Sequence, residues 1–137
     1  MNISFEPERL QVSRPLGATG TTILALTGEL DAGTTRKLAS GIGHVLAMDP
    51  APETVILDLS ELSFLSLAGI RFVYAAHAGA GAEGIRLRVV TGHRPAVQGA
   101  LRATGFTAVL DCYETTESAV LAGGLAEFLK DMHASWV

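Results

Sequence analysis

The sequence predicts an α/β fold: a mixed, mostly parallel five-stranded sheet with about four helices, in the order β-β-α-β-α-β-α-β-α. Short apolar runs typical of buried strands alternate along the chain with segments whose apolar residues recur at helical spacing. Strands separated by helices need crossover connections, and these make neighbouring strands parallel. With 137 residues and 48% hydrophobic content, we expect a single domain over residues 1–137, with its core at about 9–132.

The first third of the chain predicts a β-hairpin followed by a helix. Residues 9–14 and 21–27 have strand character, and the glycine-rich segment 17–20 between them is a turn signal, so this pair should be antiparallel. Asp31 is suited to be the helix N-cap, because its carboxylate can accept a free backbone N–H. The helix should run to about Ala47. Its expected buried stripe is Leu38, Ile42, Val45 and Leu46.

The middle of the chain predicts a buried strand that leads into a second helix. Residues 54–59 are almost continuously apolar, and a helix should follow from Gly69 to about residue 80. Three hydroxyls, those of Ser60, Ser63 and Ser66, lie at or near the connection. Ser66 can cap the helix by accepting an N–H from residue 68 or 69. The first N–H groups of a helix can also hold an anion or a partner's side chain.

The last third predicts two further strands and two further helices. The strands are expected at 85–90 and 108–112. Pro95 suits the first turn of the helix between them, and Gly105 suits its C-terminal cap. A final helix should begin at about Thr116. Its expected apolar stripe is Leu121, Leu125, Phe128, Leu129 and Met132.

Charge and composition exclude several classes of partner and location. The net charge is -4, and Arg36–Lys37 is the only adjacent basic pair, so nucleic acid is not an expected partner. The single cysteine, Cys112, indicates a reducing compartment. No apolar run approaches the length of a membrane span, and the N-terminus has no signal-peptide order. We therefore expect a cytoplasmic protein without direct membrane insertion.

Motifs for catalysis, metals and nucleotides are missing from the sequence. The four histidines fit no metal-ligand spacing, and Cys112 has no neighbouring basic residue that would activate it. The glycines of segment 79–84 follow a helix and precede a strand, which is the wrong order for a phosphate-binding loop. We expect no catalytic residue, no metal and no cofactor, and therefore not an enzyme.

The strand-to-helix connection is thus the expected functional site. Leu67 directly follows the expected cap, where an exposed leucine would contribute little to the fold but could fill a partner's pocket. Two structural alternatives remain open. Leu67 can instead pack on the third strand, and Ser66 can act as a helix cap only.

Three segments of the sequence resemble the STAS family, the bacterial anti-sigma factor antagonists. They are LTGELD at 26–31, DLSELSFLSLAGI at 58–70 and ALRATGF at 100–106. The resemblance implies a single STAS-like domain that binds an anti-sigma factor, a protein with a histidine-kinase-like ATPase domain, and thereby releases sigma. It implies a role in transcription regulation by partner switching. A STAS subunit of a lipid-transporting membrane ABC system and a small flavodoxin-like ligand-binding domain are the alternatives.

The resemblance also identifies a departure from the family pattern. The family's junction reads D-[ST]-[ST]-G, and the hydroxyl directly before the glycine is phosphorylated by the anti-sigma kinase. Aligned without gaps, the acceptor position falls on Ala68, which cannot be phosphorylated, and only Gly69 is kept. Ser66 and Ser63 are the alternative acceptors. Arg71 stands where the family often has a small residue.

The expected partner-binding residues gather at this junction and at the turn before the first helix. They are Asp31, Ser63, Ser66, Leu67, Ala68, Gly69 and Arg71. The sequence leaves open whether the protein is a monomer or a homodimer.

Overall fold

The computed structural model describes residues 9–122, which contain a five-stranded sheet with the strand order β1-β2-β3-β4-β5. β1 pairs with β2 antiparallel, and the pairs β2–β3, β3–β4 and β4–β5 are parallel. The α/β class, the mixed sheet and the order of elements predicted from the sequence are confirmed. The strands are β1 (Leu10–Ser13), β2 (Thr21–Leu30), β3 (Thr54–Leu65), β4 (Arg86–Val90) and β5 (Cys112–Tyr113).

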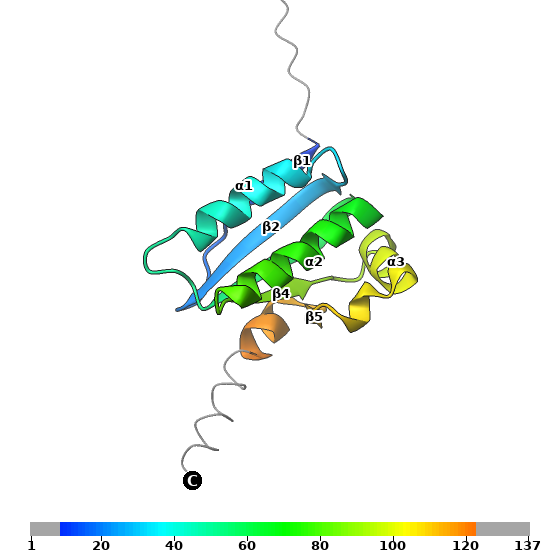
Figure 1. Cartoon of the computed structure of the whole chain (residues 1–137). Helices are drawn as coiled ribbons and strands as arrows, with labels where there is room; N and C mark the ends of the chain where they lie inside the picture. Colours follow the sequence, from blue (N-terminus) through cyan, green and yellow to red (C-terminus); the bar gives the residue numbers. More distant parts are fainter. Residues whose placement is uncertain (1–8, 123–137) are drawn as a thin grey trace, which may run out of the picture.

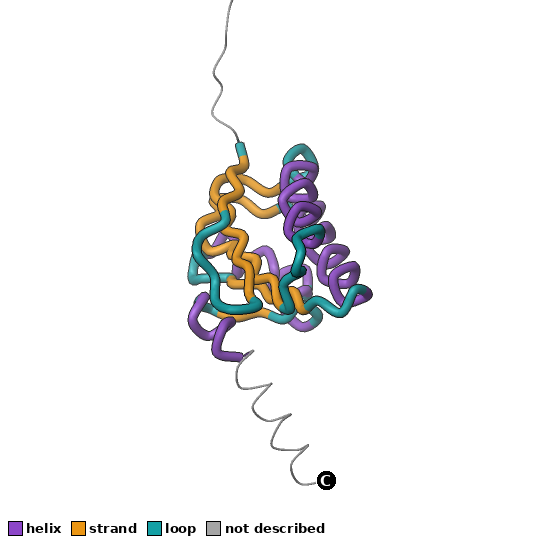
Figure 2. The backbone as a smooth tube through the Cα atoms, turned by 90° about the vertical axis from the view of Figure 1, so that its left-hand side faces the viewer, coloured by secondary structure: helices purple, strands orange, loops and turns teal. Residues whose placement is uncertain are grey.

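Three helices cover one face of the sheet, and a fourth lies on the opposite side (Figures 1 and 2). The first three are α1 (Thr35–Leu46), α2 (Leu67–Ala82) and α3 (Pro95–Thr104), and α3 is followed by the short 3₁₀ helix η1 (Phe106–Ala108). The fourth helix begins at Thr116 and is described as far as residue 122. Most of its predicted apolar stripe, from Leu125 to Met132, lies outside the described residues.

The two faces of the sheet carry separate apolar clusters because side chains alternate along each strand. Leu24 of β2 and Leu57 of β3 belong to the larger cluster, which includes Leu38 of α1 and Ile70 of α2. On the other face, the fourth helix packs Ala119 against one residue from each of three central strands. These three are Ile23, Ile56 and Val90.

The buried stripe of α1 is confirmed, but its predicted cap is wrong. Leu38, Ile42 and Val45 are buried, and Leu46 packs partly against them. The helix begins at Thr35 with Thr34 as N-cap. The carboxylate of Asp31 instead accepts the N–H of Gly33 at 2.9 Å, because a turn intervenes between β2 and the helix.

The predicted ends of α3 are confirmed, whereas the predicted bounds of the strand after it are wrong. Pro95 occupies the first turn, and Gly105 ends the helix in the left-handed conformation with φ of 77°. Residues 108–112 do not form the predicted strand. The chain makes η1 first, and only Cys112 and Tyr113 pair with β4. η1 takes up residues that could otherwise have extended the strand, so β5 begins later than predicted and is short.

Candidate functional site

β3 is longer than the sequence predicts, and its second half forms the approach to the site. It continues to Leu65 instead of ending at residue 59. Its pairing with β2 shifts register twice, and each shift places an extra residue in β3. These bulges bring Leu59, Leu62 and Leu65, three residues apart, to the buried side. Ser60 and Ser63 therefore belong to the strand and not to a connecting loop.

The start of α2 is fixed to the end of β2 by a short set of hydrogen bonds. Ser66 is the N-cap, and its hydroxyl accepts the N–H of Gly69 at 3.1 Å, as predicted. The N–H of Ser66 donates to the carbonyl of Leu30 at 3.0 Å. α2 begins at Leu67, two residues earlier than expected. The turn is thus held by groups on both sides, and its backbone is ordered before any partner arrives.

The structure exposes several side chains at this junction. Leu67 is 44% exposed, which excludes the alternative that it packs beneath the helix on β3. Phe64, which the sequence analysis missed, is 48% exposed. Ala68 and Arg71 are exposed as well. We call Ser63, Phe64, Leu67, Ala68 and Arg71 the junction surface.

Phe64 was missed because regular alternation cannot describe the end of β3. Residues 63 and 64 are both exposed, whereas a regular strand would bury one of two neighbours. A signal for this was present in the sequence. Leu59, Leu62 and Leu65 recur every three residues, which does not fit a period of two and indicates bulges.

Gly69 and Asp31, and also Ser63 of the junction surface, make contacts within the fold. Gly69 is buried, and a Cβ atom built on it would lie 2.7 Å from the carbonyl oxygen of Leu30. Asp31 is paired with Arg9, which also forms an ion pair with Glu29 at 3.1 Å. These carboxylates raise the pKa of Arg9, the hydrogen bond to Glu29 being the larger cause. The hydroxyl of Ser63 donates to the carbonyl of Gly28 at 3.1 Å.

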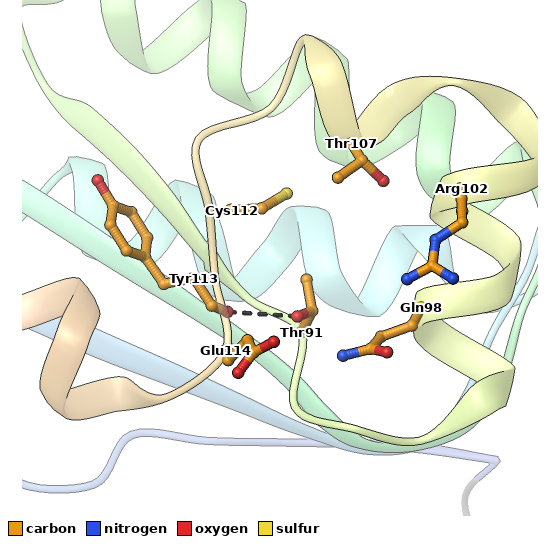
Figure 3. A pocket seen from close by; sticks show the side chains of 7 residues that line it. All are labelled: Thr91, Gln98, Arg102, Thr107, Cys112, Tyr113 and Glu114. Carbon is orange, nitrogen blue, oxygen red and sulfur yellow. Dashed lines mark hydrogen bonds between the residues drawn. The ribbon is translucent and has the colours of Figure 1, made fainter.

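A small hollow of about 190 Å³ lies between α3 and the carboxyl ends of β4 and β5 (Figure 3). Gln98 and Arg102 reach into it from α3, opposite Thr91 and Cys112. Burial, helped by Asp111, raises the pKa of Cys112 from 9.0 to about 11, so at neutral pH its sulfur is a thiol and not a nucleophilic thiolate. This arrangement offers no activated nucleophile, and it leaves the junction surface as the better candidate.

The described part of the chain has neither a cluster of metal ligands nor a membrane-spanning helix. Within residues 9–122, no three His, Cys, Asp or Glu side chains come together in a way that could hold a metal ion. No helix in the same range is long and apolar enough to cross a bilayer. His77 of α2 is half-buried, and its Nδ1 lies 3.2 Å from the carbonyl oxygen of Leu87.

The sequence matches the model of one known protein family over most of its length. The model of the STAS domain matches residues 15–119, which is most of the chain and includes the whole junction. The chain belongs to the STAS domain family. Among curated proteins, none matches the sequence significantly.

Solved structures with the STAS fold agree with this assignment. An anti-sigma factor antagonist from Mycobacterium paratuberculosis is 26% identical, with a TM-score of 0.74, 85% of this chain and 96% of that one being covered. Unphosphorylated SpoIIAA, also an anti-sigma factor antagonist, is 20% identical, with a TM-score of 0.64 and coverage of 80% and 93%. The murine anion transporter Slc26a9 is 19% identical, with a TM-score of 0.65, but this chain covers only 18% of it and 77% of itself. This chain thus matches nearly the whole of each antagonist chain, but only a small part of the transporter.

Proposed function

We propose that this STAS domain is a regulatory protein-binding module that binds an anti-sigma factor through the junction surface and thereby releases sigma. The exposure of Leu67 directly after the helix cap is the observation that carries the proposal. An apolar side chain that is 44% exposed contributes little to its own core, but it can anchor a partner when a pocket covers it. Similarity to two anti-sigma factor antagonists supports an anti-sigma factor as the class of partner.

The junction supplies both apolar area and one charge. Phe64 and Leu67 provide the apolar contacts, and Ser63 and Ala68 allow a partner's backbone to come close. Arg71 adds a cation one turn into α2, which favours a partner with an acidic group there. Ser66 and Gly69 hold the turn from which Leu67 projects, and Asp31 holds the neighbouring turn between β2 and α1. The partner we propose is a cytoplasmic protein with a histidine-kinase-like ATPase domain.

We further propose that phosphorylation at the family's usual position does not regulate this binding. A phosphate adds a charge of about -1.5 to -2, which an apolar partner surface rejects. Ala68, at the aligned acceptor position, has no oxygen that could carry a phosphate. Ser66 and Ser63 are the remaining candidates, but each hydroxyl already has a hydrogen-bond partner within the fold. The domain would then be permanently competent to bind.

Isothermal titration of the purified chain with an anti-sigma factor that has a histidine-kinase-like ATPase domain, from the same organism, tests the proposal. Wild type should bind, and Leu67→Asp should weaken binding by about a hundredfold with an unchanged melting temperature. Val109→Asp is the matched control, because Val109 is 53% exposed but lies outside the junction surface. Equal affinity of Leu67→Asp and wild type would contradict the proposal. Copurification with permease and ATPase subunits would instead favour a transporter-associated role.

The proposed lack of a phosphoswitch has its own measurement. Intact-mass analysis of protein from its native cells should show an unmodified chain under conditions that activate and inactivate sigma. A stoichiometric phosphoserine at Ser66 or Ser63 would show that the acceptor has moved and that binding is switched after all.

A further inference from the structure

The hollow between α3 and the carboxyl ends of β4 and β5 contains polar side chains that the fold does not use (Figure 3). Arg102 lines it from the last turn of α3, Thr107 from η1, and Glu114 from the position directly after β5. Within residues 9–122, these three side chains have neither a hydrogen-bond partner nor an ion-pair partner. Ligands of open α/β sheets commonly bind outside the carboxyl ends of the strands, so unused polar groups at this edge indicate a binding site.

The walls between these side chains are held in place by the fold itself. Thr91 is 7% exposed, and its hydroxyl donates to the carbonyl of Tyr113 at 3.3 Å. Nε2 of Gln98 donates to the carbonyl of Gly92, which leaves Oε1 of Gln98 available as an acceptor. The N–H of Gly92 donates to the carbonyl of Glu114 at 3.1 Å, so the segments after β4 and β5 are tied together. A ligand therefore meets a preformed site and loses little affinity to ordering it.

The two charged side chains determine which ligands the hollow can accept. Arg102 and Glu114 lie on different sides of it, with Thr91 and Gln98 between them, and they are not paired with each other (Figure 3). Glu114 would repel a ligand that is only an anion, and Arg102 would repel one that is only a cation. A ligand with both charges satisfies both side chains. The planar guanidinium of Arg102 can donate two parallel hydrogen bonds to a carboxylate, while Glu114 and Oε1 of Gln98 can accept from an ammonium group.

The volume of the hollow limits the size of such a ligand. A cavity of about 150 Å³ holds a molecule of the size of benzene. The hollow measures about 190 Å³, which leaves room for roughly six to eight non-hydrogen atoms. The half-buried Cys112 adds an apolar contact to the lining. α-Amino acids with a short side chain have this size, and at neutral pH they carry one carboxylate and one ammonium group.

We propose that this hollow binds a small neutral α-amino acid. Arg102 and Thr107 hold its carboxylate, and Glu114 and Gln98 hold its ammonium group. The site is separate from the junction surface, because its lining comes from α3, η1 and the ends of β4 and β5, whereas the junction surface belongs to β3 and α2. Binding in the hollow needs no anti-sigma factor, so it can be measured on the chain alone and independently of the proposed function.

Amide chemical shifts of the ¹⁵N-labelled full chain, recorded during titration with glycine, L-alanine, L-serine and L-valine, test the proposal. At least one of these amino acids should shift the amides of Thr91, Gln98 and Thr107 saturably, with a dissociation constant of about 0.1–1 mM. Its analogues without the amino group or without the carboxylate (propionate and ethylamine for L-alanine) should bind about tenfold more weakly. A lack of saturable shifts at these amides would overturn the proposal, and so would equal binding of either analogue.

Charge-removing variants assign the two ends of the ligand. Arg102→Met and Glu114→Gln should each weaken binding by about tenfold, with unchanged thermal midpoints. Arg86→Met and Glu83→Gln are the matched controls, because Arg86 and Glu83 are also exposed but do not line the hollow. Both controls should bind like wild type. An equal loss of affinity in the controls would overturn the assignment, because it would show a general effect of charge.

Cys112 supplies a second readout inside the hollow, because it is the only cysteine of the chain and belongs to the lining. A saturating concentration of the amino acid that binds should slow alkylation of Cys112 by iodoacetamide several-fold, as followed by intact mass. The same concentration should give no protection in Arg102→Met. Alkylation of wild type at an unchanged rate would place the ligand elsewhere and would overturn the proposal.

Discussion

Gly69 lies so close to Leu30 that no side chain fits between them. A Cβ atom at Gly69 would lie 2.7 Å from the Leu30 carbonyl oxygen and 2.9 Å from its Cγ atom. The same carbonyl accepts the N–H of Ser66. The end of β2 and the first turn of α2 therefore share one contact, and this contact sets the position from which Leu67 projects.

Gly69→Ala should destabilise the fold. The added methyl group meets backbone, which cannot move aside as a flexible side chain can, so we expect a loss of about 1–3 kcal/mol in the free energy of unfolding. Gly43→Ala in α1 is the matched control, because a Cβ there meets nothing within 4 Å. That variant should gain about 0.5–1 kcal/mol from helix propensity. Urea denaturation measures both, and equal effects would contradict the close approach.

Gly28→Ala should be more damaging than Gly69→Ala. Gly28 has φ of +100°, and a Cβ atom there would collide with the backbone carbonyl of Arg9, the residue directly before β1. Gly105→Ala isolates the conformational part, because Gly105 also has a positive φ of +77° but a Cβ there has open space. The difference in thermal midpoint between these two variants should reflect the collision. Similar midpoints would contradict it.

Ser66→Ala should cost about 1 kcal/mol in stability, because it leaves the N–H of Gly69 without its cap. Ser66→Asp should restore most of that stability, since its carboxylate can accept the same N–H and interacts favourably with the helix N-terminus. Chemical denaturation of the two variants checks the order. If alanine and aspartate are equally stable, the hydroxyl does not act as a cap.

Because of Cys112, the stability of the fold and the reactivity of the Cys112 thiol should both change with pH in the alkaline range. Its folded pKa of about 11 lies above the ordinary 9.0, so between these values the unfolded chain loses the proton while the folded chain keeps it. Stability should therefore fall as pH rises from about 9 to 11. Cys112→Ser should weaken this dependence. Alkylation of the folded protein should be slow at pH 8 and accelerate towards pH 11, and fast alkylation at pH 8 would contradict the raised pKa.

Removing Asp111 should destabilise the fold more than removing Arg88. Arg88 is 4% exposed on the sheet face beneath the fourth helix. Its Nε lies 3.5 Å from the Asp111 carboxylate, and its Nη1 donates to the carbonyl of Ala119 at 3.4 Å. Asp111→Ala leaves the buried cation unpaired and should cost about 1–3 kcal/mol. Arg88→Met should cost less, because it removes the charge together with its need for a partner. Calorimetric unfolding compares the two, and the reverse order would contradict this account.

Local signals in the sequence were enough to predict much of the fold. The α1 stripe, the Ser66 cap and the Gly105 cap each depend on residues within one or two helical turns, so short-range chemistry determines them. The position of β5 depends on where η1 ends, and the local spacing of apolar residues does not specify that point. Asp31 had the right chemistry for a cap, but Arg9, distant in sequence, and the turn at Gly33 engage its carboxylate instead.

The candidate site was predictable in part for the same reason. Leu67 follows a recognisable cap, so its exposure could be expected from the sequence. The three-residue spacing of the β3 leucines indicates bulges, but the exposure of Phe64 itself results from how β3 pairs with β2 across the sheet. Register between strands is a long-range property, and a strand pattern with a period of two does not contain it.

The two bulges in β3 divide that strand into parts with different tolerance for change. Its first half pairs with β2 on one side and with β4 on the other, whereas its second half pairs with β2 alone. Substitutions at the exposed positions Ser63 and Phe64 can therefore change the surface that the strand presents, whereas Leu62 and Leu65 of the same half belong to the core. A designer who wished to give this scaffold a new binding specificity would vary the exposed positions and keep the buried leucines.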